Sequence, residues 1–278
     1  MPPARYTELE VSGEAFDRPP CPPRTKIVIC ATQRTGSYLL CRAMIHCGLG
    51  VPHEYFHHLH IPLIGPRCGL AALADSARLQ TDPDLRQSYI AALLQRRTVN
   101  GIFAVKLQGG EYAEFLDNNE GMELLEGADI IYLWREDLLG QAISRHIAML
   151  TGRWGTDATV TTPPAENPDF FDSDQIIRHA NELAREDASW RLFFVQNGIR
   201  PLILSYESLC ADIGGSLRKI VAAFHLDLPA ADCEYAEPPA ERPAQEPLRA
   251  AIRQRFLALN RRFDPAAPCS WPEAAGGG

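Results

Sequence analysis

Four short runs of apolar and β-branched residues recur along the chain, each bounded by turn-forming or charged residues. They cover residues 26–31 (KIVICA), 101–107 (GIFAVKL), 128–134 (ADIIYLW) and 200–206 (RPLILSY). The runs are continuously apolar and do not alternate with polar residues, which is typical of parallel strands that are covered on both faces.

Helical patterns follow these runs. They predict helices over residues 37–47, 111–125, 137–150 and 207–224, and a longer helix over 173–196. The longer helix begins at a Ser-Asp capping signal and stops before an Asn-Gly pair. Strand alternating with helix predicts an α/β fold in which helices flank a central parallel sheet.

The two ends of the chain differ in composition from its middle. Residues 1–24 are polar and rich in proline, which predicts an N-terminal arm outside the core. Residues 266–278 end in AAGGG and are expected to form a flexible tail, which leaves residues 25–265 as one domain. Inside that domain, residues 153–172 are rich in Thr, Pro and Asp and are expected to form a long loop or insertion near the functional site.

Composition and charge narrow the classes of partner. The chain has 278 residues, of which 46% are hydrophobic, and its formal net charge is −8. A net acidic protein repels nucleic acid and anionic membranes, so any bound anion must be held by local cations and backbone amides. The eight cysteines form no C-x-x-C pair, the chain starts without a signal pattern, and no apolar stretch approaches the ~20 residues that span a bilayer. We therefore expect a cytoplasmic protein.

The strongest local signal follows the first apolar run. The loop Thr32-Gln33-Arg34-Thr35-Gly36 leads at once into a helix that begins at Ser37. Unpaired backbone N–H groups and the positive end of that helix favour a bound anion. The loop lacks the Gly-Lys-[Ser/Thr] of a magnesium-dependent nucleotide loop, whereas Arg34 offers a fork suited to sulfate or phosphate without a metal. An ordinary turn and a kinase-like or NTP-binding P-loop remain alternatives.

The residues from Ala31 to Leu40, ATQRTGSYLL, resemble the donor loop of sulfotransferases, most closely the bacterial trehalose 2-sulfotransferase family. A second match begins at Arg135 after the third apolar run: sulfotransferases place an arginine there and a serine eight or nine residues on, here Ser144. The resemblance covers most of residues 25–225. It implies a P-loop-like sulfotransferase fold, 3′-phosphoadenosine 5′-phosphosulfate (PAPS) as sulfuryl donor and no metal.

The same resemblance implies roles for individual residues. The donor's phosphosulfate would lie on Arg34, Thr35, Gly36, Ser37 and Tyr38, and its 3′-phosphate on Arg135 and Ser144. Glu54 would act as general base on the acceptor hydroxyl, with Arg34 and Lys106 meeting the charge that develops on the transferred group. Tyr38 stands where the family commonly has threonine.

The acceptor implied by the resemblance is a carbohydrate or glycolipid hydroxyl. Val51 replaces a second acidic residue of the family three positions before the base, which argues against trehalose itself. Tyr55, Phe56 and Trp154 are candidates to line a sugar-binding cleft, or else belong to the core. Members of the family also form homodimers, so a homodimer is one possible assembly.

Residues 53–57 also match H-E-x-x-H, the signature of zinc proteases. That motif binds zinc only on a helix, where both histidines share one face, and Pro52 and Pro62 leave little room for one. We therefore expect His57, His58 and His60 to be polar lining or surface, with a zinc hydrolase as the less favoured alternative. A nucleotide-binding module without catalysis is a further alternative.

Overall fold

The structure is a computed structural model that describes residues 7–109, 121, 124–152, 154, 170–226, 235 and 242–260, the last range with side chains from 246 onward. Most of the helix predicted over 111–125, most of the segment 153–172 and the whole of the predicted tail 266–278 lie outside the described residues.

The four apolar runs form one parallel sheet, as predicted. Its strands are β1 (Thr25–Ala31), β2 (Ile102–Gln108), β3 (Ala128–Trp134) and β4 (Leu202–Ser205), in the order β2-β1-β3-β4. Val28 of β1 pairs with Val105 of β2 and with Ile130 of β3, and all three strand pairs are parallel. The predicted α/β fold is therefore confirmed.

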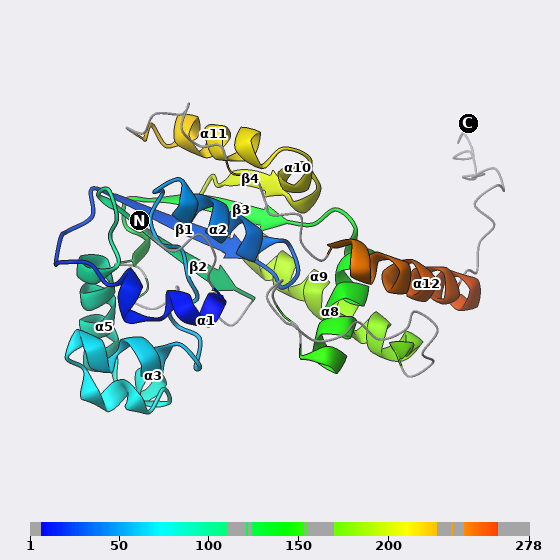
Figure 1. Cartoon of the computed structure of the whole chain (residues 1–278), viewed down its shortest axis with the longest axis horizontal. Helices are drawn as coiled ribbons and strands as arrows, with labels where there is room; N and C mark the ends of the chain where they lie inside the picture. The colour runs from blue at the N-terminus through cyan, green and yellow to red at the C-terminus, as the bar shows by residue number, and fades with distance from the viewer. Residues whose placement is uncertain are drawn as a thin grey trace, which may run out of the picture.

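Helices cover both faces of this sheet, which explains why the strands are apolar throughout (Figure 1). On one face, Ile27 and Ile29 pack with residues of α2 (Ser37–His46), α10 (Tyr206–Ala211) and α11 (Ile213–Ala223). On the other face, Val28 and Cys30 pack with residues of α5 (Pro83–Arg96) and α9 (Ser173–Gln196).

Three predicted helices match the structure closely. They are α2, α8 (Leu138–Thr151) and α9, of which α8 is capped by Asp137 and α9 by Asp172. The single helix predicted over 207–224 is wrong, because the chain breaks at Asp212 into α10 and α11. Asp212 adopts an extended conformation, and its carboxylate accepts a hydrogen bond from the backbone N of Gly215, so it caps the second helix.

Several short or weakly patterned elements were not predicted. They are α1 (Glu8–Val11), η1 (Glu14–Phe16), α3 (Ile61–Ile64), η2 (Pro66–Cys68), η3 (Ala71–Ala74), α4 (Arg78–Thr81), α5 and α12 (Arg242–Asn260). The last of these packs Leu248 and Ile252 against α8 and α9. No helix in the described part of the chain combines the length and apolar character that crossing a membrane requires.

The N-terminal segment contributes to the core, contrary to the expectation for residues 1–24. Val11 and Phe16 are buried against Ile45. The buried guanidinium of Arg97 donates to the backbone O of Val11 (2.7 Å) and pairs with Asp17 (3.0 Å). This segment therefore lies against the body of the protein, where it is in reach of the sheet edge that carries the site.

Candidate active site

The predicted site residues gather at the carboxyl ends of three adjacent strands. The loop 32–36 follows β1, Lys106 lies near the end of β2, and Arg135 follows β3 directly. Since β1 lies between β2 and β3, the strand order reverses here, which is where open α/β sheets bind ligands.

The loop after β1 has an unusual backbone that its sequence permits. Arg34 (φ 67°) and Gly36 (φ 77°) both adopt left-handed conformations, and Gly36 is the N-cap of α2. A Cβ atom at Gly36 would lie 2.7 Å from a ring carbon of Tyr206, so only glycine fits. The turn directs the first backbone N–H groups of α2 to the sheet edge.

Polar side chains fix this loop from within the fold. Thr35 Oγ1 donates to the backbone O of Thr32 (2.9 Å). The Gln141 side-chain amide of α8 donates to Thr32 Oγ1 (2.8 Å) and to the backbone O of Gln33 (2.7 Å). No sequence motif marks Gln141, because its partners lie more than a hundred residues away.

Two guanidinium groups contact one hydroxyl, and a third lies beside them. Arg34 Nε lies 3.0 Å from Ser144 Oγ, and a terminal nitrogen of Arg249 lies 3.5 Å from the same oxygen. Arg135 donates to the backbone O of Arg34 (3.3 Å), while Ser144 itself is only 3% exposed. The structure thus brings together Arg34, Arg135 and Ser144, which the sequence predicted, and adds Arg249, which it did not.

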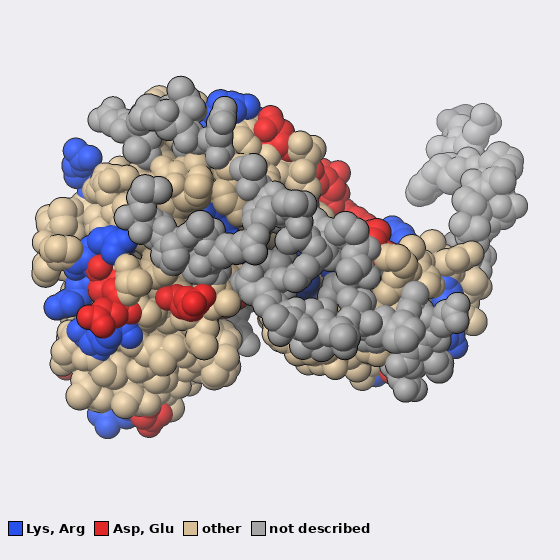
Figure 2. Space-filling model, in the orientation of Figure 1, with Lys and Arg blue, Asp and Glu red and all other residues tan. Residues whose placement is uncertain are grey.

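This arginine cluster, formed by Arg34, Arg135 and Arg249, creates a local positive field. Burial, with smaller contributions from the charges of Arg249 and Arg135, lowers the pKa of Arg34 to about 10. Like charges held together in this way favour a bound anion. On the face shown in Figure 2, most of the described basic side chains lie beside acidic ones, as expected for a protein of net charge −8.

Salt bridges hold α12 and Arg135 in place. Both terminal nitrogens of Arg253 bind the Asp137 carboxylate (2.7 and 3.0 Å). Because Arg253 lies one turn after Arg249, this pair keeps Arg249 beside Ser144. The Arg135 guanidinium lies over the Tyr206 ring (4.3 Å) and its Nε is 3.8 Å from Glu207 Oε1.

A second cluster contains the predicted base. Lys106 Nζ lies 3.0 Å from Glu54 Oε1 and 2.8 Å from Glu8 Oε1, and the lysine is only 3% exposed. Burial alone would lower the pKa of Lys106, but the carboxylates of Glu54 and Glu8 outweigh it and hold this pKa well above its usual value. Sequence reasoning missed Glu8, since it lies on a four-residue helix in the presumed arm.

The loop connects the two clusters. Gln108, two residues after Lys106 on β2, donates through Nε2 to Ser37 Oγ (2.9 Å). The Tyr38 ring lies 6.0 Å from Lys106 Nζ and 5.7 Å from the Arg42 guanidinium. The loop and the start of α2 therefore stand between the arginine cluster and the Glu54–Lys106 pair.

The three predicted aromatic residues have different environments. Tyr55 is fully buried and donates through its hydroxyl to the backbone O of Val51 (2.5 Å), and Phe56 belongs to the same core cluster. Both are therefore core residues. Trp154 is 41% exposed, and its backbone O accepts a hydrogen bond from the Arg34 guanidinium.

The H-E-x-x-H pattern lacks the helix that a zinc protease needs. Residues 51–60 form turns and irregular backbone, and the next helix, α3, starts at Ile61. His53 Nε2 faces Ser12 Oγ (2.8 Å), whereas Glu54 faces Lys106. The structural requirement of the zinc protease alternative is therefore not met.

Comparison with known proteins gives consistent matches. A family model described as Stf0 sulphotransferase matches residues 26–255. A trehalose 2-sulfotransferase of Mycobacterium tuberculosis (strain Erdman) is 25% identical, covering 72% of this chain and 84% of its own. Two solved structures each align over 87% of this chain with low TM-scores. A sulfotransferase from Alicyclobacillus acidocaldarius has a TM-score of 0.41 and 14% identity, and 97% of its chain is covered. The sulfotransferase domain of the Synechococcus PCC 7002 olefin synthase has a TM-score of 0.39 and 16% identity, and 96% of its chain is covered.

Proposed function

Because this chain belongs to the Stf0 sulphotransferase family, we propose that it transfers a sulfuryl group from PAPS to a hydroxyl group of a carbohydrate or glycolipid-type acceptor. Sulfotransferase activity follows from the family; the donor, the acceptor class and the residue roles are the proposal. The observation that carries it is the arginine cluster around Ser144, beside a loop whose amides face the same edge of the sheet.

The donor has two anionic ends, and the site has two kinds of anion ligand. We assign the phosphosulfate to the loop amides, including that of Thr35, to the Ser37 hydroxyl and to the Arg34 guanidinium. Arg135, Ser144 and Arg249 bind the 3′-phosphate. Arginine suits this task because its guanidinium stays protonated and presents several donors to phosphate oxygens. The arrangement calls for no metal ion at the donor.

Transfer is an in-line displacement at sulfur. The acceptor oxygen forms a bond to sulfur while the bond between sulfur and the bridging phosphate oxygen breaks, and adenosine 3′,5′-bisphosphate leaves. Glu54 takes the proton of the acceptor hydroxyl. Lys106 orients the Glu54 carboxylate through their 3.0 Å contact and lies where it can meet charge on the sulfuryl oxygens.

The acceptor class follows from the relative and from the surroundings of Glu54. The matching relative is named a trehalose 2-sulfotransferase, which supports a carbohydrate hydroxyl. This chain has Val51, buried against the N-terminal segment, where the resemblance implies a second acidic residue, and it brings Glu8 to Lys106 instead. We therefore propose a carbohydrate-type acceptor other than trehalose.

A thermal-shift titration tests the donor assignment. With EDTA present, adenosine 3′,5′-bisphosphate should raise the melting temperature increasingly as its concentration exceeds the dissociation constant, whereas ATP should do so far less with or without magnesium. In the Arg135→Ala variant, at least tenfold more bisphosphate should be needed to give the same rise in melting temperature. Stabilisation by magnesium-ATP alone would contradict the proposal and favour a kinase-like protein.

A further inference from the structure

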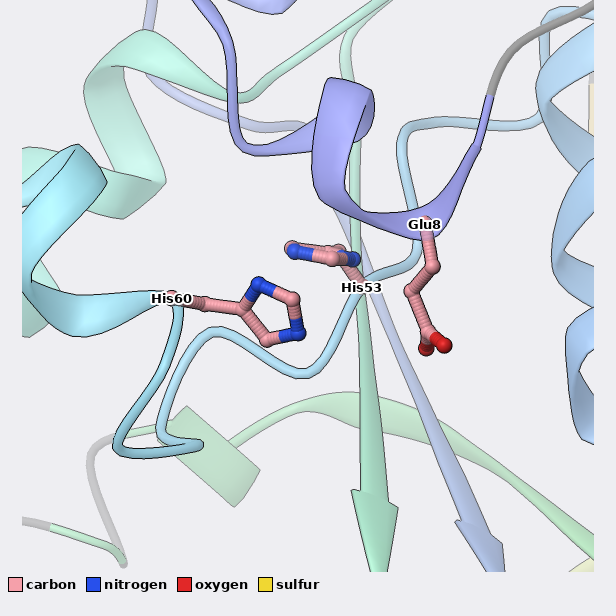
Figure 3. Close-up of side chains that lie close together, drawn as sticks. All are labelled: Glu8, His53 and His60. Atoms are coloured by element: carbon pink, nitrogen blue, oxygen red, sulfur yellow. The ribbon is translucent and has the colours of Figure 1, made fainter. Parts of the chain in front are cut away.

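Two histidines and one glutamate lie close together beneath the N-terminal helix α1. Figure 3 shows Glu8 on α1 with the rings of His53 and His60 beside it, His53 lying between the other two. Each side chain offers one ligand atom, and these atoms lie within 4.8 Å of one another. The two imidazole rings are 4.2 Å apart between centroids. The transfer step proposed above gives none of these three residues a chemical role, although Glu8 pairs with Lys106.

A shared partner orients both rings. Ser12 Oγ lies 2.8 Å from His53 Nε2 and 2.8 Å from His60 Nδ1. A hydroxyl oxygen has two lone pairs, so it can accept from both rings at once. The other nitrogen of each ring then carries a lone pair. Metal-binding histidines characteristically have their second nitrogen held by such a hydrogen bond.

The chemistry of the three groups suits a borderline transition metal. Burial lowers the pKa of His53 well below its usual value and that of His60 to about 4, so both imidazoles are neutral near pH 7. Ligand atoms around a tetrahedral zinc ion lie about 3.3 Å apart, given Zn–N bonds of about 2.0 Å. Shifts of the side chains by about 1 Å would bring the three atoms to that spacing.

We propose that Glu8, His53 and His60 form a binding site for Zn²⁺ or a similar transition-metal ion. Two histidines and one glutamate are an established ligand set for zinc, with the fourth position left to water. This set differs from the H-E-x-x-H pattern, because it uses residues seven apart together with Glu8 from another element.

The position of this site predicts that the metal inhibits the enzyme. Glu8 also pairs with Lys106 (2.8 Å), and a second possible ligand group, Glu54 with His57 and His60, shares one histidine. A divalent ion would compete with Lys106 for Glu8 and alter the surroundings of Glu54. This consequence for turnover rests on the proposed function, whereas metal binding itself does not.

The test measures metal binding alone, on chelator-treated full-length protein without donor or acceptor. Isothermal titration with Zn²⁺ should show one site per chain. Glu8→Gln and His60→Gln should each weaken binding at least tenfold, while the matched variants Glu14→Gln and His58→Ala, both at exposed positions, should bind as the parent does. Glu8→Gln is the safer variant for folding, because Glu8 is half-buried and His60 is buried.

The absorption spectrum of bound Co²⁺ identifies the ligands. A site of two imidazoles and a carboxylate gives d–d bands without the thiolate-to-cobalt charge-transfer band. That band would show binding to a cysteine such as the exposed Cys21 and would overturn the proposal. Equal affinity in the parent, Glu8→Gln and His60→Gln proteins would also overturn it, as would the absence of any binding at millimolar metal.

Discussion

At the scale of single residues, Ser144 is the residue around which the donor site is arranged. Its hydroxyl contacts guanidinium groups from the loop after β1 and from α12, whose positions in the sequence are far apart. The three positive charges of the arginine cluster repel one another, so their arrangement is unfavourable until an anion binds. The two anionic ends of the donor would turn that repulsion into charge-assisted contacts, the phosphosulfate with Arg34 and the 3′-phosphate with Arg135 and Arg249.

Arg249→Ala should lower the affinity for adenosine 3′,5′-bisphosphate by about 10- to 100-fold, the loss expected for one charge-assisted hydrogen bond. The affinity for AMP, which lacks the 3′-phosphate, should change little. Titration calorimetry measures both ligands. Arg255→Ala is the matched control, because Arg255 lies on the same helix over the Phe171 ring. Equal losses for both ligands would instead indicate a structural role for Arg249.

Glu54→Gln should reduce kcat by about 10²- to 10⁴-fold, since it removes the group that accepts the proton. Binding of the bisphosphate should not change, because Glu54 belongs to the other cluster. Steady-state kinetics with PAPS and an accepted sugar measure the first effect and calorimetry the second. If Glu54→Gln kept the kcat of the parent protein, the general base would have to be another group.

The sequence predicts part of this site. Arg34, Arg135 and Ser144 could be predicted because local motifs carry them, each next to a strand end. Gln141, Glu8 and Arg249 could not, because no local pattern accompanies them and only tertiary packing brings them to the site. Of the two alternatives for Tyr55 and Phe56, the structure shows the core, which the sequence could not decide because an aromatic pair does not reveal which side is solvated.

At the scale of elements, helices α8 and α9 bury a pair of histidines. His146 and His179 face each other with ring centroids 5.8 Å apart, between the two helices. Burial lowers the pKa of both; His179 lowers that of His146 further, and Arg145 lowers that of His179 further. Asp172 and Glu182 act in the opposite direction without cancelling this effect.

A lowered pKa makes stability depend on pH. The unfolded chain takes up protons on these histidines below about pH 6.5, whereas the folded protein resists doing so. The free energy of unfolding should therefore be highest above pH 6.5 and decrease as the pH falls toward 5. Urea unfolding at several pH values measures it, and His179→Gln should make the decrease smaller. A decrease as steep in this variant as in the parent would contradict the account.

Helices and strands with a strong pattern of apolar and polar positions could be predicted from the sequence, whereas those with a weak pattern could not. The strands of the sheet are continuously apolar because both faces are covered, so their sequences stand out. The break at Asp212 was missed because a capping residue inside a helical pattern looks like an ordinary polar position. α12 was missed because its polar face is wide and Pro247 interrupts the pattern.

At the scale of the whole molecule, the site draws on both ends of the described chain. Glu8 comes from the first described helix and pairs with Lys106 of β2, and Arg249 comes from the last and lies beside Ser144. Figure 1 shows these two helices, α1 and α12. Truncation at either end should therefore change activity and not only stability. The domain limits predicted as 25–265 stay a prediction, but a protein lacking the first 24 residues would lose Glu8, one of the two carboxylates beside Lys106.

The most direct test of the central claim is sulfuryl transfer itself. The protein is incubated with PAPS and EDTA, with and without neutral mono- and disaccharides. Mass spectrometry then measures the release of adenosine 3′,5′-bisphosphate and the formation of the sulfated sugar. We expect that release of the bisphosphate depends on a sugar, continues in EDTA and nearly disappears in the Glu54→Gln variant. Tight binding of the bisphosphate without transfer to any hydroxyl acceptor would contradict the account and identify a binding module without catalysis.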